Sequence, residues 1–327
     1  MANFRKPVRN AISSLFVCSV IFNALPAQAA YPEKPIKVVV PTAAGTPIDL
    51  VTRIVATRMA KDLGQPMVID NKPGATGTVG AMDVLRNAND GYTVMTMLMP
   101  ISVAPALQDK IPYDLKRDFA PIGQTAWSYN VLVTHPSVTA QSLPELVSLL
   151  KANPGKYSYS SGGLGTPAHM IAEMFKLQNK VFAVHVPYNQ FAQAMTDLVG
   201  GTNQFMFVAT APAAQFIAQG RLKPLVVMAP QRVSSLPQVP SVGELGLTDL
   251  VVRDWQGLAV KTGTSPEIVA RLNKSILVAL ADPDVQKSLA AMGVDPAPGT
   301  PEQFRDLINS ELIRWAAVVK AQGLNSQ

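Results

Sequence analysis

The residues best suited to chemistry in this sequence are glycines and small hydroxyl residues that separate a strand-like run from a helical pattern. Residues 157–160 predict a strand, Gly162-Gly163-Leu164-Gly165-Thr166-Pro167 a turn, and residues 168–177 a helix. Such a junction brings free backbone N–H groups and the positive end of the helix dipole to one point in space. The sequence therefore predicts an anion site that needs no cationic side chain.

A second junction of the same kind lies near the start of the chain. Residues 36–40 predict a buried strand, residues 41–47 form a small-residue loop that contains Gly45, and residues 48–63 predict a helix that Gly64 ends. Two such helix starts that face each other across a cleft would grip a small carboxylate. The alternative is that Gly162, Gly163 and Gly165 only make a turn.

Alternating strands and helices must position these loops, and the pattern predicts an α/β fold with mainly parallel sheets. Ser142 and Glu145 form a capping box that opens a helix. Ser265-Pro266 and Thr300-Pro301 each start a further helix, because a cap residue precedes a proline. Strands are expected at residues 67–70, 93–98, 181–186, 204–208 and 224–228, and helices at residues 78–86, 143–152, 191–199 and 212–219.

Extended segments in the middle of the chain indicate a crossing between two lobes. Residues 119–125 and 131–134 predict two strands that meet around residues 127–130, and residues 251–260 would return to the first lobe. We therefore expect lobe 1 to comprise residues 31–127 and 255–327, and lobe 2 residues 128–254. Two lobes on a two-strand hinge can clamp a ligand by rigid-body closure.

The first thirty residues are typical of a secretory signal peptide. Arg5, Lys6 and Arg9 form a positive segment, residues 11–25 are apolar, and Ala27-Gln28-Ala29 is a small-x-small cleavage signature. Cleavage is expected after Ala29 or Ala30. A membrane anchor is the alternative, disfavoured because the apolar run is too short for a comfortable span.

Composition excludes several classes of function. The only cysteine, Cys18, lies in the signal segment, so the mature chain has no thiol nucleophile and no disulfide. Removal of the signal leaves 25 of the 28 basic residues against 22 acidic ones, a net charge of +3 without a basic run, which disfavours nucleic-acid binding. His135, His169 and His185 lack ligand spacing, so we expect no metal and no cofactor.

Several short stretches, in this order and spacing, resemble the substrate-binding proteins of tripartite tricarboxylate transporters, also called the Bug family. They are Tyr31-Pro32-Glu33-Lys34-Pro35-Ile36, residues 41–49, Asn71-Lys72-Pro73-Gly74, Asp90-Gly91-Tyr92-Thr93, Ala152-Asn153-Pro154-Gly155-Lys156, residues 160–169, His185-Val186-Pro187-Tyr188 and Asp197-Leu198-Val199-Gly200-Gly201. The resemblance implies a monomeric, non-enzymatic periplasmic binding protein of two lobes and type II-like fold. It would deliver small organic acids to the integral membrane subunits of a transporter.

In that family the two strand–helix loops hold the ligand carboxylate, often with ordered water. Asp49 is expected to complement the helix dipole and could also order the first loop. His169 would face either the cleft or the packed interior, Tyr188 either the pocket or the core, and His135 and His185 are expected to be structural. The candidate ligand-binding residues are Thr42, Ala43, Ala44, Gly45, Thr46, Asp49, Ser160, Ser161, Gly162, Gly165, Thr166, His169, Tyr188, Val208 and Ala209.

The sequence departs from the family at two positions that bear on the ligand. The first loop reads Pro41-Thr42-Ala43-Ala44-Gly45-Thr46, where the family commonly has Pro-Phe-x-x-Gly-Gly. Val208 follows Phe207, where many members carry an aspartate that can pair with an ammonium group. We therefore expect a mono- or dicarboxylic acid without an amino group, on an apolar or aromatic body.

Two other functions remain open from the sequence. A loaded binding protein can present itself to a membrane sensor with the same clamp. A secreted α/β hydrolase could use Ser160 or Ser161, but the chain lacks the Gly-x-Ser-x-Gly elbow and an evident base.

Overall fold

The computed structural model describes residues 1–3, 31–108 and 110–324. The signal peptide expected at residues 1–30, with its cleavage site, falls almost entirely outside these ranges. The unit from Pro32 onward forms one compact body and is described below. Within the described ranges, every helix is too short or too polar to cross a membrane.

The first part of this unit is built as the sequence predicts, around three parallel strands. β1 (Ile36–Val40) pairs in parallel with β2 (Met67–Asn71) and β3 (Thr93–Leu98). α1 (Pro47–Leu63) and α2 (Thr78–Leu85) connect them, with the short 3₁₀ turn η1 (Ala75–Gly77) directly before α2. Gly64 ends α1 in the left-handed conformation that only glycine adopts without strain.

The helix α3 (Met99–Leu107), followed by the short α4 (Leu115–Asp118), was not predicted. Pro105 disfavours an isolated helix here, since a proline in the helix interior removes a backbone donor and crowds the preceding turn. Seven of its nine residues are nevertheless buried, and the helix packs against the C-terminal helix α11 (Pro301–Gln322). Tertiary burial therefore outweighs local propensity in this segment.

The two middle strands expected from the sequence are one continuous strand, so that prediction was wrong. β4 (Phe119–Thr134) is sixteen residues long and changes partner along its length. It pairs with β9 (Arg253–Lys261) as far as Tyr129, and from Asn130 onward with β7 (Phe205–Ala209) and β8 (Lys223–Val227). Antiparallel pairing with β9 as far as Tyr129 and with β7 from Asn130 gives residues 126–130 strand partners, which local pattern alone left open. The lobe boundaries at residues 128 and 254 stay a prediction.

The second part again alternates strands and helices. β5 (Ser158–Ser161) pairs in parallel with β6 (Val184–Pro187) and with β7. The helices are α5 (Leu143–Ala152), α6 (Pro167–Asn179), α7 (Phe191–Val199) and α8 (Thr210–Ala218), and the short turn η2 (Thr248–Leu250) precedes β9. β6 begins three residues later than expected, because Val181 donates its N–H to Lys176 and belongs to the end of α6.

Four elements complete the unit after β9. α9 (Pro266–Ala281) begins at the Ser265 cap, and the capping box of Thr300 and Gln303 begins α11, as predicted. α10 (Pro283–Ala291) and β10 (Val294–Pro296) were missed, although Asp282 before Pro283 carries the same cap–proline signature.

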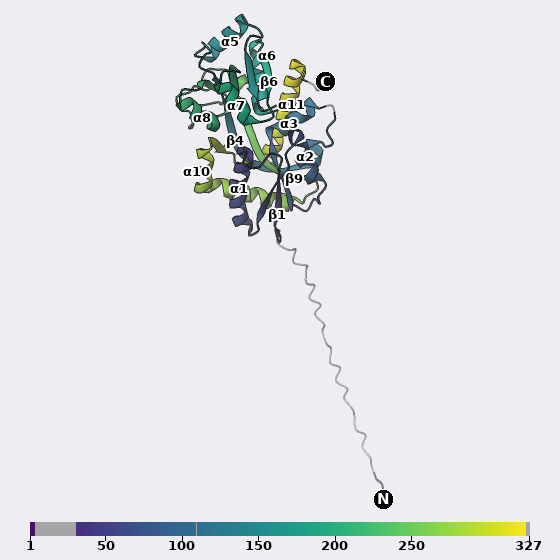
Figure 1. Cartoon of the computed structure of the whole chain (residues 1–327). Coiled ribbons are helices and arrows are strands. Elements are labelled where there is room, and N and C mark those ends of the chain that lie inside the picture. Colours follow the sequence, from purple (N-terminus) through teal and green to yellow (C-terminus); the bar gives the residue numbers. More distant parts are fainter. Residues whose placement is uncertain (4–30, 109, 325–327) are drawn as a thin grey trace. The chain divides into compact units, whose positions relative to one another are not determined.

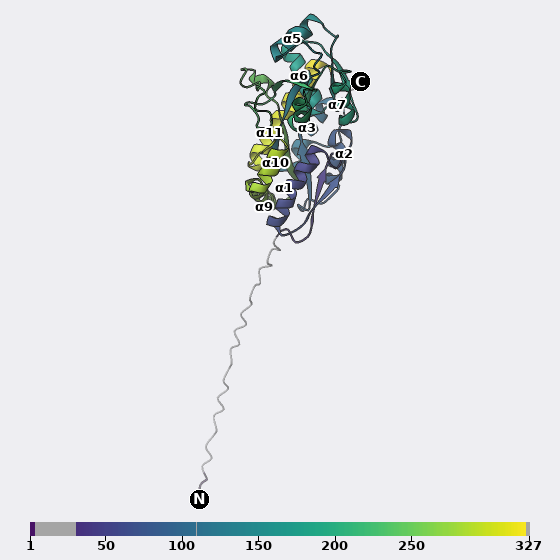
Figure 2. The ribbon, with the colours of Figure 1, turned by 60° about the vertical axis from the view of Figure 1, so that its left-hand side comes forward.

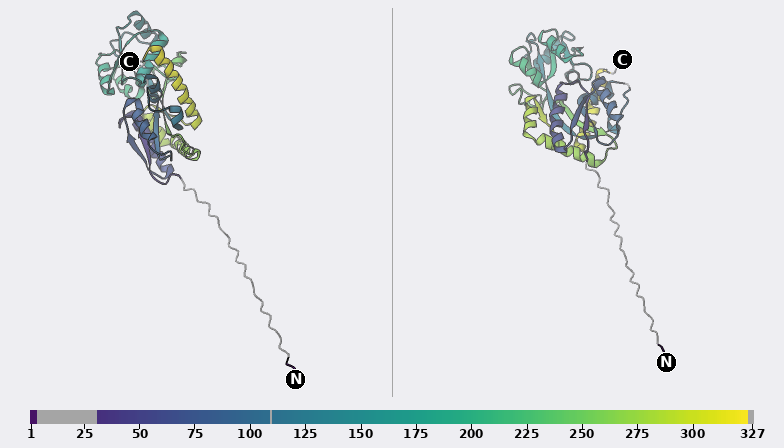
Figure 3. Two further views of the ribbon diagram at one scale, coloured as in Figure 1. Left: turned by 90° about the vertical axis from the view of Figure 1, so that its right-hand side faces the viewer. Right: turned by 60° about the horizontal axis from the view of Figure 1, so that its bottom comes forward.

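The strands of the described residues follow the order β2-β1-β3-β9-β4-β7-β5-β6, with β8 and β10 attached to β4. Figure 1 shows α5, α6, α7 and α8 at one end of this unit and α1, α2 and α10 at the other. α1, α9 and α10 lie side by side in Figure 2, and α11 runs beside the sheet in Figure 3.

Close packing where β4, β9 and α11 meet gives a testable consequence. A Cβ added at Gly257 would lie 2.3 Å from Phe304 Cζ and 2.7 Å from the Gly123 carbonyl oxygen. We therefore expect Gly257→Ala to lower the free energy of unfolding by about 1–3 kcal/mol or more, measured by denaturant titration. Gly162→Ala is the control, because its Cβ would meet only Thr166 Cγ2 at 3.8 Å. Equal stability of the two variants would contradict this packing.

Candidate ligand-binding site

The loop after β1 is fastened by the carboxylate of Asp49, which is 1% exposed. Its Oδ2 accepts hydrogen bonds from the Gly45 N–H at 2.8 Å and from Arg53 Nε at 2.9 Å, and its Oδ1 accepts one from Asn71 Nδ2 at 2.9 Å. Burial opposes the ionised form, but bonds from Arg53, Asn71 and Gly45 hold the pKa of Asp49 below its usual value. Asp49 therefore orders this loop.

The other polar groups of the first loop bond among themselves. Thr46 donates its hydroxyl to the Ala43 carbonyl at 2.9 Å and lies 2.9 Å from the Thr42 hydroxyl. Ala43, Ala44 and Gly45 are exposed. Among the described residues, none accepts a hydrogen bond from the backbone N–H of Ala43, Ala44 or Ile48. These donors at the start of α1 are available to an anion.

The glycine-rich loop after β5 is fastened in a closely similar way. The Gly165 N–H donates to His169 Nδ1 at 3.2 Å, and the Gly163 N–H donates to Ser161 Oγ at 3.1 Å. Thr166 donates its hydroxyl to the Gly163 carbonyl at 2.7 Å, and its N–H points to the same oxygen at 3.4 Å. Within the described chain, no group accepts from the N–H of Leu164, Ala168 or His169, so this loop also offers free donors.

The two loops share one local motif, which the sequence analysis overlooked. Gly45-Thr46-Pro47-Ile48-Asp49 and Gly165-Thr166-Pro167-Ala168-His169 both read Gly-Thr-Pro-x followed by a hydrogen-bond acceptor. The two threonines have almost the same backbone angles, with φ of −68° and −70° and ψ of 156° and 157°. In both loops the glycine N–H bonds to the side chain four residues later.

A third strand–loop–helix junction, from the end of β2 through η1 to the start of α2, contacts both loops. A Cβ at Gly165 would lie 2.8 Å from Leu107 Cδ1 and 3.4 Å from Thr76 Cγ2, so the glycine-rich loop packs directly on α3 and η1. A Cβ at Gly77 would lie 3.7 Å from the Cβ of Pro41, at the start of the first loop. The signal was present in the sequence, since Pro73, Gly74 and Gly77 lie between a predicted strand and a predicted helix.

This third junction has strained backbone. Ala75 and Thr76 adopt positive φ angles of 46° and 53°, which are unusual for residues other than glycine. α2 begins without a side-chain hydrogen bond to its first turn. The segment therefore adds a third helix start beside those of α1 and α6, and like α6 it lacks a side-chain cap.

The remaining candidate residues lie behind the loops. Tyr188 donates its hydroxyl to Asp197 Oδ2 at 2.7 Å and accepts from Asn203 Nδ2 at 2.7 Å. Val208 is 1% exposed and packs in a hydrophobic cluster with α7, whereas Ala209 is half-buried. The Ser160 hydroxyl is buried, and no described residue pairs with it.

Two histidines that are distant in the sequence meet beneath the glycine-rich loop. The His169 and His185 rings stack with their centroids 4.3 Å apart, and His185 Nε2 lies 2.7 Å from Ser161 Oγ. Burial lowers the pKa of both imidazoles to about 4. The described residues contain no cluster of three or more histidine, cysteine, aspartate or glutamate side chains that could hold a metal.

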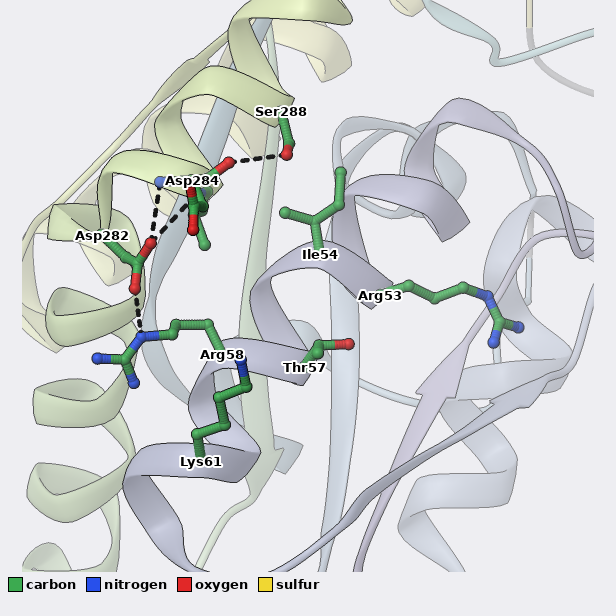
Figure 4. Close-up of a pocket in the computed structure, with 9 residues that line it drawn as sticks. Arg53, Ile54, Thr57, Arg58, Lys61, Asp282, Asp284 and Ser288 are labelled. Carbon is green, nitrogen blue, oxygen red and sulfur yellow. Dashed lines mark hydrogen bonds and ion pairs between the residues drawn. The ribbon is translucent and has the colours of Figure 1, made fainter.

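A separate surface pocket of about 360 Å³ lies between α1 and α10. Figure 4 shows its wall, where Arg58 bonds to Asp282 at 2.6 Å. Arg53 also borders this pocket, but its guanidinium bonds to Asp49 and Asn71. None of the residues of the two ligand loops lines it.

The fold and site fit the comparisons with known proteins. The model of the tripartite tricarboxylate transporter family receptor matches residues 51–324, and the chain belongs to this family. It is 32% identical over 315 residues to Protein BugT of Bordetella pertussis strain Tohama I, covering 96% of this chain and 97% of that protein.

Two solved structures support the same conclusion. The periplasmic binding protein BugD is 32% identical, with a TM-score of 0.78 over 91% of this chain and all of that chain. MatC from Rhodopseudomonas palustris with bound malate is 31% identical, with a TM-score of 0.77 over 88% of this chain and all of that chain. The expected α/β fold of a two-lobed periplasmic binding protein is confirmed.

The role of Asp49 predicts a stability effect. Asp49→Asn keeps the side-chain volume but has one acceptor oxygen where the carboxylate has two, so its buried amide cannot accept from Gly45, Arg53 and Asn71 together and at least one of these hydrogen bonds is lost. We expect a loss of about 1–3 kcal/mol in the free energy of unfolding, measured by denaturant titration. The exposed Asp306→Asn, whose carboxylate has no partner in the described chain, should stay within about 0.5 kcal/mol. No difference between these variants would contradict the role of Asp49.

The buried histidines predict how stability depends on pH. The pKa of His169 falls from 6.5 to about 4 on folding, so the unfolded chain binds a proton between these values while the folded chain does not. Stability should therefore be complete above pH 6.5 and fall as the pH drops towards 4, by about 3 kcal/mol for this shift of a fully buried imidazole. His169→Asn, which cannot titrate, should have a flatter profile in thermal melts at each pH. An unchanged profile would contradict the shift.

Proposed function

We propose that the chain captures a small organic acid in the cleft between its two lobes. The observation that carries this proposal is the pair of Gly-Thr-Pro loops, each of which leaves backbone N–H groups of a helix start without an acceptor in the described chain. Helix starts of this kind bind anions through aligned donors and the helix dipole. The malate bound to the relative MatC supports a carboxylate as the anion.

The charge around the loops favours a ligand of low charge density. Residues 42–46 and 162–166 contain no lysine or arginine, and the Arg53 guanidinium is engaged by Asp49 and Asn71. A trianion or an ammonium group would lose its hydration there without a compensating partner. We infer a mono- or dicarboxylate without an amino group.

Apolar side chains around the same strand ends favour an apolar or aromatic ligand body. Leu50 and Val79 are 42% and 44% exposed in the first turns of α1 and α2, and Leu164 and Phe191 are 61% and 44% exposed at the corresponding ends of β5 and β6. Ligands of open α/β sheets bind outside the carboxyl ends of the strands. We infer that these four side chains cover such a body.

We further propose that the protein is monomeric, works in the periplasm after removal of its signal peptide, and delivers its ligand to integral membrane transporter subunits. Family membership supports this role. Catalysis by the Ser161–His185 pair is disfavoured, because Ser161 is fully buried and the lowered pKa makes His185 a weak base.

Paired ligands test the proposal. We expect succinate to bind the exported, purified protein more tightly than its amino derivative aspartate, measured by calorimetry. A broader thermal-shift screen should include adipate, benzoate and citrate, since a ligand at a hundred times its Kd adds about 2.7 kcal/mol of stability. Tighter binding of aspartate would overturn the ligand class, and the absence of binding by every organic acid would overturn the function.

A further inference from the structure

The glycine-rich loop is held from behind by an imidazole in a defined protonation state. His169 is fully buried, and its Nδ1 accepts the Gly165 N–H at 3.2 Å. A ring nitrogen that accepts a hydrogen bond carries no proton, so a neutral His169 has its proton on Nε2. This hydrogen bond therefore requires one tautomer of one protonation state.

Ring stacking, and not a hydrogen bond from Nε2, keeps His169 in place. Its Nε2 is buried and has no hydrogen-bond partner in the described chain, and its ring stacks on His185 at 4.3 Å with an interplanar angle of 23°. His185 in turn stacks on Tyr159 at 4.8 Å and contacts Ser161, which accepts the Gly163 N–H. The two imidazoles thus lie behind the amides on either side of Leu164.

The charged groups near the rings belong to α6. Lys176 Nζ bonds to both carboxylate oxygens of Glu173, at 2.7 and 2.9 Å, and the Tyr159 hydroxyl bonds to Glu173. The neighbouring strands β5 and β7 contain no charged residue. Burial, and to a smaller extent the charge of Lys176, lowers the pKa of His169 to about 4. Glu173 raises the pKa of His185 and so partly offsets the effect of burial on that ring.

The first ligand loop shows what the acceptor does. Asp49 occupies the position that corresponds to His169, and its carboxylate accepts the Gly45 N–H as an anion. The acceptor at the fourth position is therefore a recurring part of both loops, and His169 supplies it without a charge. Gly165 packs on α3 and η1 and lies between the free N–H groups of Leu164 and Ala168, so a shift of its amide would disturb these donors.

We propose that His169 is a positioning residue whose neutral, Nε2-protonated imidazole holds the glycine-rich loop in its ligand-binding conformation, and that protonation of Nδ1 releases the loop and weakens ligand binding. The ligand readout rests on the proposed function, whereas the tautomer of His169 does not. Protonation converts Nδ1 from an acceptor to a donor, so it would face the Gly165 N–H with a second N–H. The loop must then move.

A pair of substitutions separates this role from simple packing. In His169→Asn the amide oxygen takes the place of Nδ1, whereas in His169→Gln the amide reaches the place of Nε2. We expect His169→Asn to bind succinate, or the tightest acid of the screen, within about threefold of the wild-type Kd. His169→Gln should bind about tenfold more weakly, as expected for the loss of one hydrogen bond. Equal losses in both variants, or a better-binding glutamine, would overturn the proposal.

The pH dependence of Kd gives the second test. The ligand titrates in the same range, but this contribution is common to the wild type and to His169→Asn, so their ratio isolates the histidine. Between pH 7 and 4 we expect the wild type to lose about twofold more affinity than His169→Asn, since roughly half of His169 is protonated at its pKa and only the neutral half binds. A wild type that gains affinity relative to His169→Asn would mean that the imidazolium attracts the ligand, and would overturn the proposal.

A measurement on the ligand-free protein keeps the two proposals distinguishable. NMR of protein labelled with ¹⁵N-histidine reports which ring nitrogen carries the proton, with His169→Asn providing the assignment. At pH 7 we expect an unprotonated Nδ1 on His169. A proton on Nδ1 overturns the proposal whether or not a ligand is found. If the tautomer is as expected but no acid binds the wild type, only the proposed function fails.

Discussion

The proposed anion site depends on one constraint, which is that backbone N–H groups must be held in place before an anion arrives. A lysine side chain can move to a ligand, but a loop amide points where the loop directs it. In both loops the fixing contact is the hydrogen bond from a left-handed glycine to the side chain four residues later, from Gly45 to Asp49 and from Gly165 to His169. The proline between them provides no N–H and leaves the following amide free. Preorganisation of this kind lowers the ordering cost of binding.

The long pairing of β4 with β9 is the second requirement, because it connects the parts that carry the two loops. β4 changes partner between Tyr129 and Asn130 without a break in its backbone. α11 supports this region from the side, where Arg314 donates to the Val251 carbonyl at 2.7 Å and Gln322 donates to the Glu173 carbonyl at 2.8 Å. The C-terminal helix therefore contacts both the returning chain and the helix that starts at the glycine-rich loop.

Much of this could be predicted from the sequence, because caps, prolines and glycines act locally. Ser265 and Thr300 marked helix starts, and the two small-residue loops were found between a strand and a helix. The continuous β4 and the proline-containing α3 could not be predicted, since distant partners decide them. The stacking of His169 on His185 depends on the register of β5 with β6, which no local pattern specifies. The repeated Gly-Thr-Pro was visible in the sequence, but its meaning came from the matched hydrogen bonds.

The difference between the two acceptors follows from electrostatics. Asp49 keeps its charge because Arg53 and Asn71 donate to it, so the first loop carries an anion with a compensating cation beside it. The corresponding position in the second loop, His169, is fully buried, and no described arginine bonds to it. The lysine on the same helix, Lys176, is already paired with Glu173. A carboxylate there would be buried without a partner and would repel the ligand carboxylate across a medium of low dielectric constant. A neutral imidazole gives the glycine amide the same acceptor without that repulsion. On the proposed role of His169, the same choice would make the second loop, and not the first, sensitive to protons near pH 4, because the Asp49 carboxylate is already stabilised in its charged form.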